Sequence, residues 1–223
     1  MARYDGIADW YDQYISTDAR PLTEQALATL RELLGPGRGR CLDLGCGGGI
    51  GIPVIASLGW SVVGVDESAD QLRVATDRAG GIAEQLVRAD AASMPFEDSS
   101  FDSVVSMFLH TDVDDIGSVF GEAARVLRPG GRLAYVGTHP CFVGHFIEPD
   151  GDRWVVHPGY AVAGWQRSGP SLGDSVRGRV GVRQVPLAEL LNALISAGFA
   201  LERVAEAGAN DPPSLLGFAA HRR

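Results

Sequence analysis

Glycines crowd the stretch CLDLGCGGGIG at positions 41–51, which also holds an acid, Asp43. Glycine loses more conformational freedom on folding than any other residue, so such clusters occur where backbone turns sharply or approaches a ligand closely. A dinucleotide, a nucleoside triphosphate and a nucleoside that bears a sulfonium can each lie over such a turn. A glycine turn that serves only tight packing is the alternative without a ligand.

The spacing within this turn argues against two of these ligands. A G-x-G-x-x-G dinucleotide fingerprint needs glycine at position 50 or 52, where Ile50 and Ile52 stand. A phosphate-binding P-loop needs Gly-Lys-Ser/Thr at its end, and the turn contains no lysine. The pattern that fits is D-x-G-x-G-x-G, from Asp43 to Gly49. An acid in this place favours a ligand that carries a positive charge and no phosphates.

Two further acids follow apolar runs. Asp66 comes after the run at 61–65, and Asp90 comes shortly after the run at 84–88. Ligands of open parallel sheets lie at the carboxyl ends of the strands, so we expect Asp43, Asp66 and Asp90 to converge there. Asp66 is placed to accept from both hydroxyls of a ribose, and Asp90 from the exocyclic amine of a purine. The alternative role for Asp66 is a helix N-cap, although Ser68 can serve as that cap.

Regular alternation of two periodicities positions these residues. Apolar runs predict strands at 40–44, 61–65, 84–88, 102–107 and 132–137, and helical spacing predicts helices at roughly 50–58, 68–79 and 115–127. Two helices are expected before this region, the second opened by Pro21, and the chain ends in a helix at 187–197 and strands at 199–206 and 215–221. The alternation predicts an α/β fold, a parallel sheet with helices on both faces.

The composition limits the function classes. A chain of 223 residues with 45% hydrophobic residues fits one domain with a substantial core. Its net charge of −9 argues against nucleic acid as a partner. No apolar run approaches the ~20 residues of a membrane span, which predicts no membrane partner.

The start does not resemble a signal peptide, and three cysteines suit a reducing compartment, so we expect a cytoplasmic protein. No Cys/His spacing indicates a metal, and the acids of DVDD at 112–115 are interpreted as a helix start.

The stretch at 139–185 differs from the rest of the chain. It has no clear period and is rich in glycine, proline and aromatic residues. A loop-like insertion of this length in a compact domain is usually functional or disordered, and its aromatics favour a function. They suggest a flat, apolar ligand, although they could equally pack the insertion against the sheet.

Together these motifs resemble the class I S-adenosylmethionine-dependent methyltransferases, in the small-molecule branch similar to methyltransferase type 11. LDLGCGGG is similar to the first motif of that family, VVGVDES to its second strand, and EAARVLRPGGRLAYVG to the segment leading into its fifth. The likeness covers residues 38–138. It implies a Rossmann-like, doubly wound sheet of seven strands in the order 3-2-1-4-5-7-6, with strand 7 antiparallel. It also implies one domain over 1–223, with lid helices at 1–34, the cofactor core at 38–138, an acceptor-side insertion at 139–185 and the last helix and strands at 186–223.

The resemblance implies roles for the turn and for the residues around the methionine part of the cofactor. Gly45, Cys46 and Gly47 would offer backbone to this part, and Met107 its carbonyl to the ammonium group. Tyr11 is similar in place to a lid tyrosine that covers the cofactor. Tyr4 shares this lid position, although both tyrosines also fit a core-facing stripe.

The nucleoside part of the cofactor would contact the ends of the next two strands. By the same resemblance Asp66 would hold the ribose, with Glu67 beside it. Asp90 and Ala91 would address the adenine through a side chain and a backbone N–H.

The implied reaction transfers a methyl group from S-adenosyl-L-methionine to a small organic acceptor and leaves S-adenosyl-L-homocysteine. Transfer from a sulfonium requires mainly positioning in a water-poor site, and a base only where the acceptor must lose a proton. His139 is the preferred candidate base and His110 the second, since each follows a strand that should end at the pocket. The alternative for either is a loop residue bonded to backbone.

Three other functions stay open beside this prediction. One is a reaction on the same fold that binds S-adenosylmethionine without transferring methyl, such as a cyclisation or an elimination. A nicotinamide oxidoreductase is disfavoured by Ile50 and Ile52. A catalytically silent partner subunit is disfavoured by the intact acids at the strand ends. The sequence predicts neither the acceptor atom nor an oligomeric state.

Overall fold

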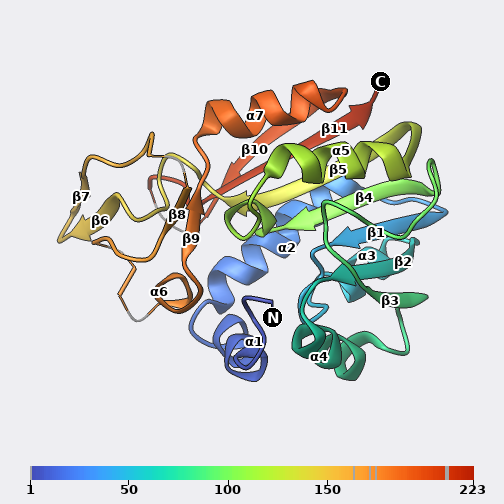
Figure 1. Ribbon diagram of the computed structural model, residues 1–223, viewed down its shortest axis with the longest axis horizontal. Helices are drawn as coiled ribbons and strands as arrows, with labels where there is room; N and C mark the ends of the chain where they lie inside the picture. Colours follow the sequence, from blue (N-terminus) through green and yellow to red (C-terminus); the bar gives the residue numbers. More distant parts are fainter. Residues whose placement is uncertain (1, 163, 171, 174, 209–210) are drawn as a thin grey trace.

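The fold is built on one seven-stranded sheet (Figure 1). The computed structural model describes residues 2–162, 164–170, 172–173, 175–208 and 211–223, so residue 1 of the expected lid region and residues 163, 171 and 174 of the expected insertion lie outside the described residues. The strand order is β3-β2-β1-β4-β5-β11-β10. The strands are β1 (Arg40–Leu44), β2 (Ser61–Asp66), β3 (Gln85–Arg88), β4 (Phe101–Met107), β5 (Leu127–Thr138), β10 (Phe199–Ala207) and β11 (Leu215–Arg222).

The sheet confirms the predicted topology. From β3 to β5 neighbouring strands run parallel, and β11 pairs antiparallel with both β5 and β10. Counted along the main sheet, β10 is the sixth strand and β11 the seventh, which is the order 3-2-1-4-5-7-6. Parallel pairing from β3 to β5 brings the carboxyl ends of these strands to one edge of the sheet.

Helices cover both faces of the sheet (Figure 1). The helices are α1 (Ala8–Ser16), α2 (Arg20–Leu34), α3 (Ile52–Ser57), α4 (Ala69–Ala79), α5 (Ile116–Val126), α6 (Val176–Val180), α7 (Leu187–Ser196) and the short 3-10 turn η1 (Leu109–Thr111). One apolar core lies between the sheet and α5 and α7, and a second core lies between the sheet and α2, α3 and the end of α4. Two cores on one sheet are what a doubly wound arrangement requires.

The predicted helix boundaries have local causes that the structure shows. The Ser68 hydroxyl accepts a hydrogen bond from the backbone N–H of Gln71 at 3.2 Å, which makes Ser68 the N-cap of α4. Asp115 caps α5 in the same way through the N–H of Gly117 at 2.9 Å, so among the acids at 112–115 it is Asp115 that begins the helix. Because Ser68 is the cap, the side chain of Asp66 is free for other partners.

The region 139–185 is more regular than the sequence predicted. It contains two small antiparallel sheets and the short helix α6, and these lie together at one end of the molecule beside α1 (Figure 1). The strands are β6 (Ile147–Asp150) paired with β7 (Arg153–Val156), and β8 (Gly164–Gln166) paired with β9 (Val182–Gln184). Strands of three or four residues are too short to show an alternating pattern, and β8 pairs with a segment distant in sequence.

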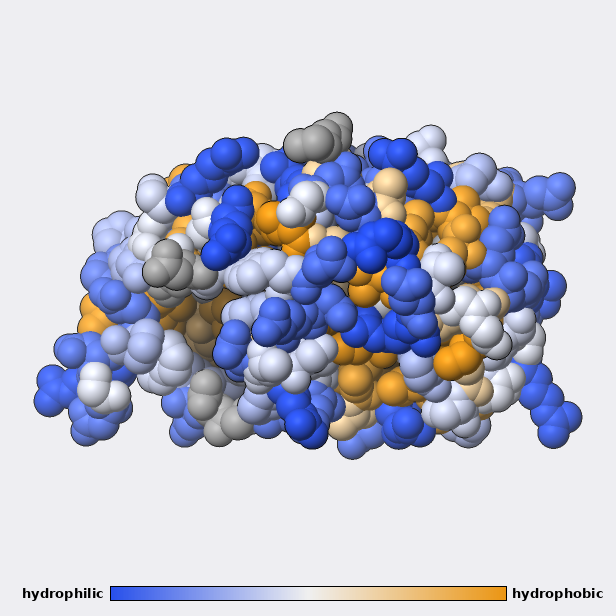
Figure 2. All heavy atoms as spheres, turned by 90° about the horizontal axis from the view of Figure 1, so that it is seen from below, coloured by the Kyte–Doolittle hydropathy of each residue, from blue (hydrophilic) through white to orange (hydrophobic). Residues whose placement is uncertain are grey.

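Within the described residues, no helix is long and apolar enough to cross a membrane. The face seen from below in Figure 2 is largely hydrophilic, with hydrophobic atoms showing in recesses between charged side chains.

Packing on α7 supplies a matched test of the fold. Replacing Leu194 with alanine is expected to lower the free energy of unfolding by about 2–5 kcal/mol, because this side chain is 0% exposed in the core beneath α5 and α7. The adjacent Ile195 is 51% exposed, and its replacement with alanine should change that free energy by about 0.5 kcal/mol or less. Denaturant unfolding of both variants measures the difference, and equal losses would contradict this packing.

Candidate functional site

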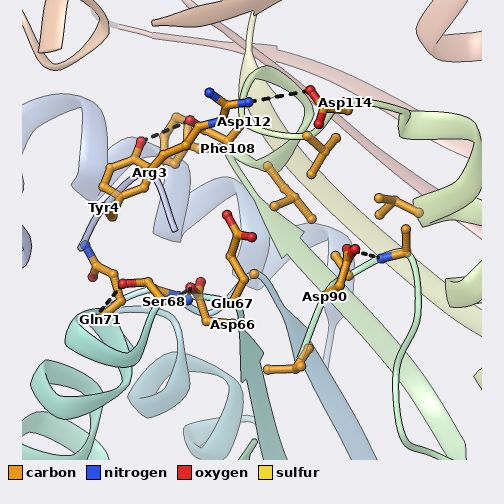
Figure 3. Close-up of a pocket in the computed structure, with 18 of the residues that line it drawn as sticks. Arg3, Tyr4, Asp66, Glu67, Ser68, Gln71, Asp90, Phe108, Asp112 and Asp114 are labelled. Carbon is orange, nitrogen blue, oxygen red and sulfur yellow. Dashed lines mark hydrogen bonds and ion pairs between the residues drawn. The ribbon is translucent and has the colours of Figure 1, made fainter. Parts of the chain in front are cut away.

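A cavity of about 490 Å³ lies at the carboxyl ends of the strands (Figure 3). Most of the sequence-predicted cofactor residues line it: Tyr11, Gly45, Gly47, Asp66, Glu67, Asp90, Ala91 and Met107. Tyr4 lines it as well. Asp43 and Cys46 are buried outside this lining, one at the end of β1 and the other within the glycine turn. The structure therefore brings residues from five separate segments to one cavity, as convergence of parallel strands requires.

The glycine turn uses its amides inside the protein. The N–H groups of Gly45 and Cys46 both donate to the carbonyl of Val65 at 2.9 Å. The N–H of Gly47 donates to Asp66 Oδ2, also at 2.9 Å. These three donors are thus occupied, in contrast to a P-loop, where such groups cradle phosphate.

Gly45 itself is required by its surroundings. Its φ of +72° lies in the left-handed region, and a Cβ at this position would come within 2.7 Å of Leu109 Cδ1. A larger residue would strain the backbone of the turn and displace the Leu109 side chain, which lines the cavity.

Asp66 holds the turn in place from the end of β2. Its Oδ1 accepts from the N–H of Ser68 and its Oδ2 from the N–H of Gly47, each at 2.9 Å. Burial raises the pKa of Asp66 to about 6, although the two backbone N–H groups act in the opposite direction. The neighbouring Glu67 is exposed and points into the cavity (Figure 3). Asp66 and Glu67 thus differ: one carboxylate is tied to backbone and the other is free.

Asp43 is a buried carboxylate with an unpaired oxygen. It is 2% exposed, and its Oδ2 has no hydrogen-bond partner. Burial, together with the nearby charge of Asp66, raises its pKa to about 7. Among the described residues no arginine lies within ion-pair distance of either carboxylate. A positive charge brought near them would relieve this repulsion.

The field in the cavity is negative. Its described lining includes one guanidinium, Arg3, and the carboxylates of Asp66, Glu67, Asp90, Asp112, Asp114 and Asp115. Arg3 is itself paired with Asp114 at 3.5 Å. Such a field attracts cations and repels the phosphates of a dinucleotide.

The N-terminal segment covers this cavity mainly through polar contacts. Ser68 donates to Asp5 at 2.7 Å, and the N–H of Gly6 donates to Asp70, also at 2.7 Å. Within α1 only Ala8 is buried. This segment is therefore held over the cavity by polar contacts more than by buried apolar surface.

A second cavity of about 400 Å³ adjoins the first. Its lining comes mainly from α1, the start of α2 and residues 138–182, with Phe108, Thr111 and Ser214 from elsewhere. It is mostly apolar, and its members include Tyr14, Leu22, Phe142, Ile147, Trp154 and Val182. Tyr11 and Phe108 line both cavities and form the wall between them. Phe108 has φ +58°, a left-handed conformation that costs about 1–2 kcal/mol for a residue other than glycine.

A polar cluster, Tyr4–Asp112–Arg177, stands beside this wall. Arg177 Nη1 donates to Asp112 Oδ1 at 2.6 Å, and the Tyr4 hydroxyl donates to the same oxygen at 3.2 Å. Tyr4 and Asp112 line the first cavity, and Arg177 lines the second. The cluster thereby joins the N-terminal segment, the loop after β4 and α6.

The two histidines predicted as bases have other partners. His110 is 2% exposed and is hydrogen-bonded through Nδ1 to the Tyr135 hydroxyl; burial lowers its pKa to about 3. His139 Nε2 bonds Glu206 Oε1 at 2.9 Å, and its Nδ1 accepts from the N–H of Cys141 at 3.2 Å. Neither His110 nor His139 lines either cavity. A base role for either histidine stays a prediction.

Sequence reasoning missed Phe108, Asp112, Gln71 and Arg177. Phe108 has no signal, since nothing in its type predicts a left-handed backbone. Gln71 is 2% exposed, lines the first cavity and has no partner for either amide atom. The sequence pattern around Asp112 is that of a helix start, and Arg177 lies in the region 139–185, which has no clear hydrophobic period. Only the pairing across 65 residues shows that these two belong to one site.

Comparisons with known proteins agree with this geometry. Residues 42–135 match the sequence model of a family described as "Methyltransferase domain". The 2-phytyl-1,4-naphtoquinone methyltransferase of Synechococcus elongatus is 38% identical over 128 residues, which is 52% of this chain and 54% of that protein. The chain therefore spans about half the length of the curated relatives it matches.

Solved structures share the fold over most of the chain. An S-adenosylmethionine-dependent methyltransferase from Mesorhizobium loti has a TM-score of 0.73 and 27% identity, covering 87% of this chain and 96% of its own. The [4+2]-cyclase SpnF has a TM-score of 0.63 and 19% identity, covering 88% and 79%, a likeness of fold.

Asp43 generates a test based on pH. The pKa of Asp43 is about 7 in the folded protein, above the ordinary value of 3.8, so the folded state binds this proton more tightly. The stability linked to that proton is fully present below about pH 4 and is lost as pH rises through about 7. Replacement with asparagine should therefore favour folding more at pH 8 than at pH 5, by on the order of 1–3 kcal/mol.

Thermal melts of Asp43→Asn and wild type at both pH values measure this as a Tm difference that grows by several degrees. Asp77→Asn, at an exposed position of α4, is the control and should show no such growth. A Tm difference for Asp43→Asn that is the same at both pH values would contradict the burial argument.

Proposed function

The chain belongs to the class I S-adenosylmethionine-dependent methyltransferases, and we propose that it transfers the methyl group of that cofactor to a small apolar acceptor. The observation that carries this proposal is the pair of adjoining cavities. One is acidic and lies at the strand ends, the other is mostly apolar, and Tyr11 and Phe108 separate them.

The first cavity fits the cofactor. Its volume of about 490 Å³ lies within the range of small-molecule sites, and its negative field suits a sulfonium and an ammonium group. The unpartnered amide of Gln71, which lines this cavity, is a polar group that a ligand or water could satisfy.

Named residues of this cavity would hold each part of the cofactor. Asp66 and Glu67 at the end of β2 would face the ribose, and Asp90 and Ala91 the adenine. The carbonyl of Met107 would face the ammonium group. Tyr11, from α1, would close over the cofactor.

When bound, the cofactor supplies a methyl group activated by positive charge on sulfur. The residues of the first cavity would hold this group beside Tyr11 and Phe108, and an acceptor in the second cavity would take up the methyl group, leaving S-adenosylhomocysteine and releasing any acceptor proton to water. The contribution of the protein is to hold the two molecules in line and to exclude water. The lid and the insertion would provide this enclosure.

The acceptor is proposed to be a small apolar molecule with flat rings, because the aromatic side chains of Phe142 and Trp154 line the second cavity. A curated relative is named for its action on a naphthoquinone, which supports this class. A volume of about 400 Å³ accommodates a molecule of two or three fused rings.

Two measurements test the proposal. Calorimetric titration should show S-adenosylmethionine and S-adenosylhomocysteine binding more tightly than NADH; the reverse order would overturn the cofactor assignment. Incubation with methyl-labelled S-adenosylmethionine and a panel of reduced naphthoquinones and phenols should then give labelled product and an equal amount of S-adenosylhomocysteine. An acceptor that is converted without release of S-adenosylhomocysteine would replace methyl transfer with a non-methylating reaction.

Asp66 provides the matching mutational prediction. Asp66→Ala should weaken S-adenosylmethionine binding at least tenfold, because a charged acceptor of hydrogen bonds contributes about 1.5–3 kcal/mol. The variant also frees the N–H groups of Gly47 and Ser68 from their acceptor. Titration calorimetry checks the change in Kd, with Asp77→Ala on the exposed side of α4 as a control that should bind normally. Unchanged affinity in Asp66→Ala would refute its role.

A further inference from the structure

We propose that the acceptor carries an acidic hydroxyl on a conjugated ring and binds as its oxyanion against Arg177. This inference rests on the proposed function and deepens it, since it names the chemical class of the acceptor. The observation behind it is one cation in an otherwise neutral cavity.

The charge distribution of the second cavity is unusual for an apolar site. Among its described lining residues, Arg177 is the single charged group, and the other polar side-chain groups are hydroxyls and the indole N–H of Trp154. The Arg177 side chain is only 16% exposed, so its charge is poorly hydrated. A buried cation that lines a ligand cavity favours an anionic group in the ligand.

The guanidinium has donors left over. Nη1 makes both of the hydrogen bonds that Arg177 donates to described residues, to Asp112 and to Tyr4. Neither Nε nor Nη2 donates a hydrogen bond to a described residue, and neither atom is fully buried. An arginine presents its N–H groups as a planar fork that matches an oxyanion or a carboxylate.

Asp112 leaves this edge of the guanidinium available. Its Oδ1 takes the bond from Nη1, while its Oδ2 accepts from the Thr111 hydroxyl at 3.2 Å. The ion pair is therefore made through one nitrogen and one oxygen, not through a two-pronged fork. Nε and Nη2 therefore remain available as donors to an anion in the second cavity, which Arg177 lines.

The same cavity holds no base that could remove a proton during the reaction. Its described lining contains no carboxylate, imidazole, amine or thiol. Burial raises the pKa of the Tyr11 phenol to about 12, so this hydroxyl stays protonated. An acceptor that arrives already ionised needs no base, because its oxygen, or a ring carbon conjugated to it, already carries the reacting electron pair.

The alternative is that Arg177 only ties α6 to the loop after β4. Two probes of nearly equal size separate these roles: 2-hydroxy-1,4-naphthoquinone, which is an anion at neutral pH, and its methyl ether, 2-methoxy-1,4-naphthoquinone. Their Kd values are measured by titration calorimetry with S-adenosylhomocysteine present. Wild type is expected to bind the anion at least tenfold more tightly than the ether.

Three variants complete the experiment. Arg177→Gln should abolish the preference for the anion. This change also leaves Asp112 without its ion-pair partner. The double variant Asp112→Asn/Arg177→Gln therefore replaces both charges with a neutral pair of amides, which can still hydrogen-bond α6 to the loop after β4. It should also lose the preference while its Tm stays near that of wild type. The control is Arg179→Gln, on the same helix. The native Arg179 guanidinium stacks on Trp10, and Arg179 does not line the cavity, so this variant should keep the preference for the anion.

The outcomes distinguish this inference from the proposed function. Equal binding of the two probes by wild type, or an anion preference that survives in the neutral pair, would overturn the role of Arg177. Loss of S-adenosylmethionine binding or of methyl transfer, with the anion preference intact, would instead overturn the proposed function.

Discussion

Two carboxylates buried side by side at the ends of β1 and β2 constrain the rest of the site. Asp43 and Asp66 repel each other, burial raises the pKa of both, and no described arginine neutralises either. The cost is reduced by backbone N–H groups on Asp66, and those groups come from the glycine turn and the start of α4. The turn therefore takes its shape from the acid it surrounds, and a cationic ligand completes the balance of charge.

This arrangement explains why the turn differs from a phosphate site of similar appearance. In a P-loop the backbone N–H groups face the ligand and attract an anion. Here the corresponding groups of Gly45, Cys46 and Gly47 are bonded to Val65 and Asp66. Acidic side chains, and not free N–H groups, therefore lie near the cavity beside the turn. The glycine content of such a turn does not identify its ligand, whereas the partners of its N–H groups distinguish an anion site from a cation site.

The second cavity and its border with the first are organised by contacts between distant segments. Arg177 on α6 meets Asp112 after β4 and Tyr4 near the N-terminus, and Phe108 adopts a left-handed backbone at the wall between the cavities. His139 contributes differently: through Glu206 it fixes the start of the insertion against β10. These contacts join the N-terminal segment, the sheet edge and the region 139–185 around the two cavities.

The sequence by itself determined the sheet, its strand order through the family resemblance, and the acids at its edge. Runs such as 61–65 have a strong local pattern, and parallel pairing sends every such strand end to the same place, so Asp66 and Asp90 could be assigned to one cavity without a structure. Only the tertiary structure decided which polar groups of the acceptor side meet. Arg177 and Asp112 are 65 residues apart, β8 pairs with a distant β9, and no period or motif encodes either contact. Such contacts depend on how short irregular segments pack against the finished sheet, and that packing is a property of the whole chain.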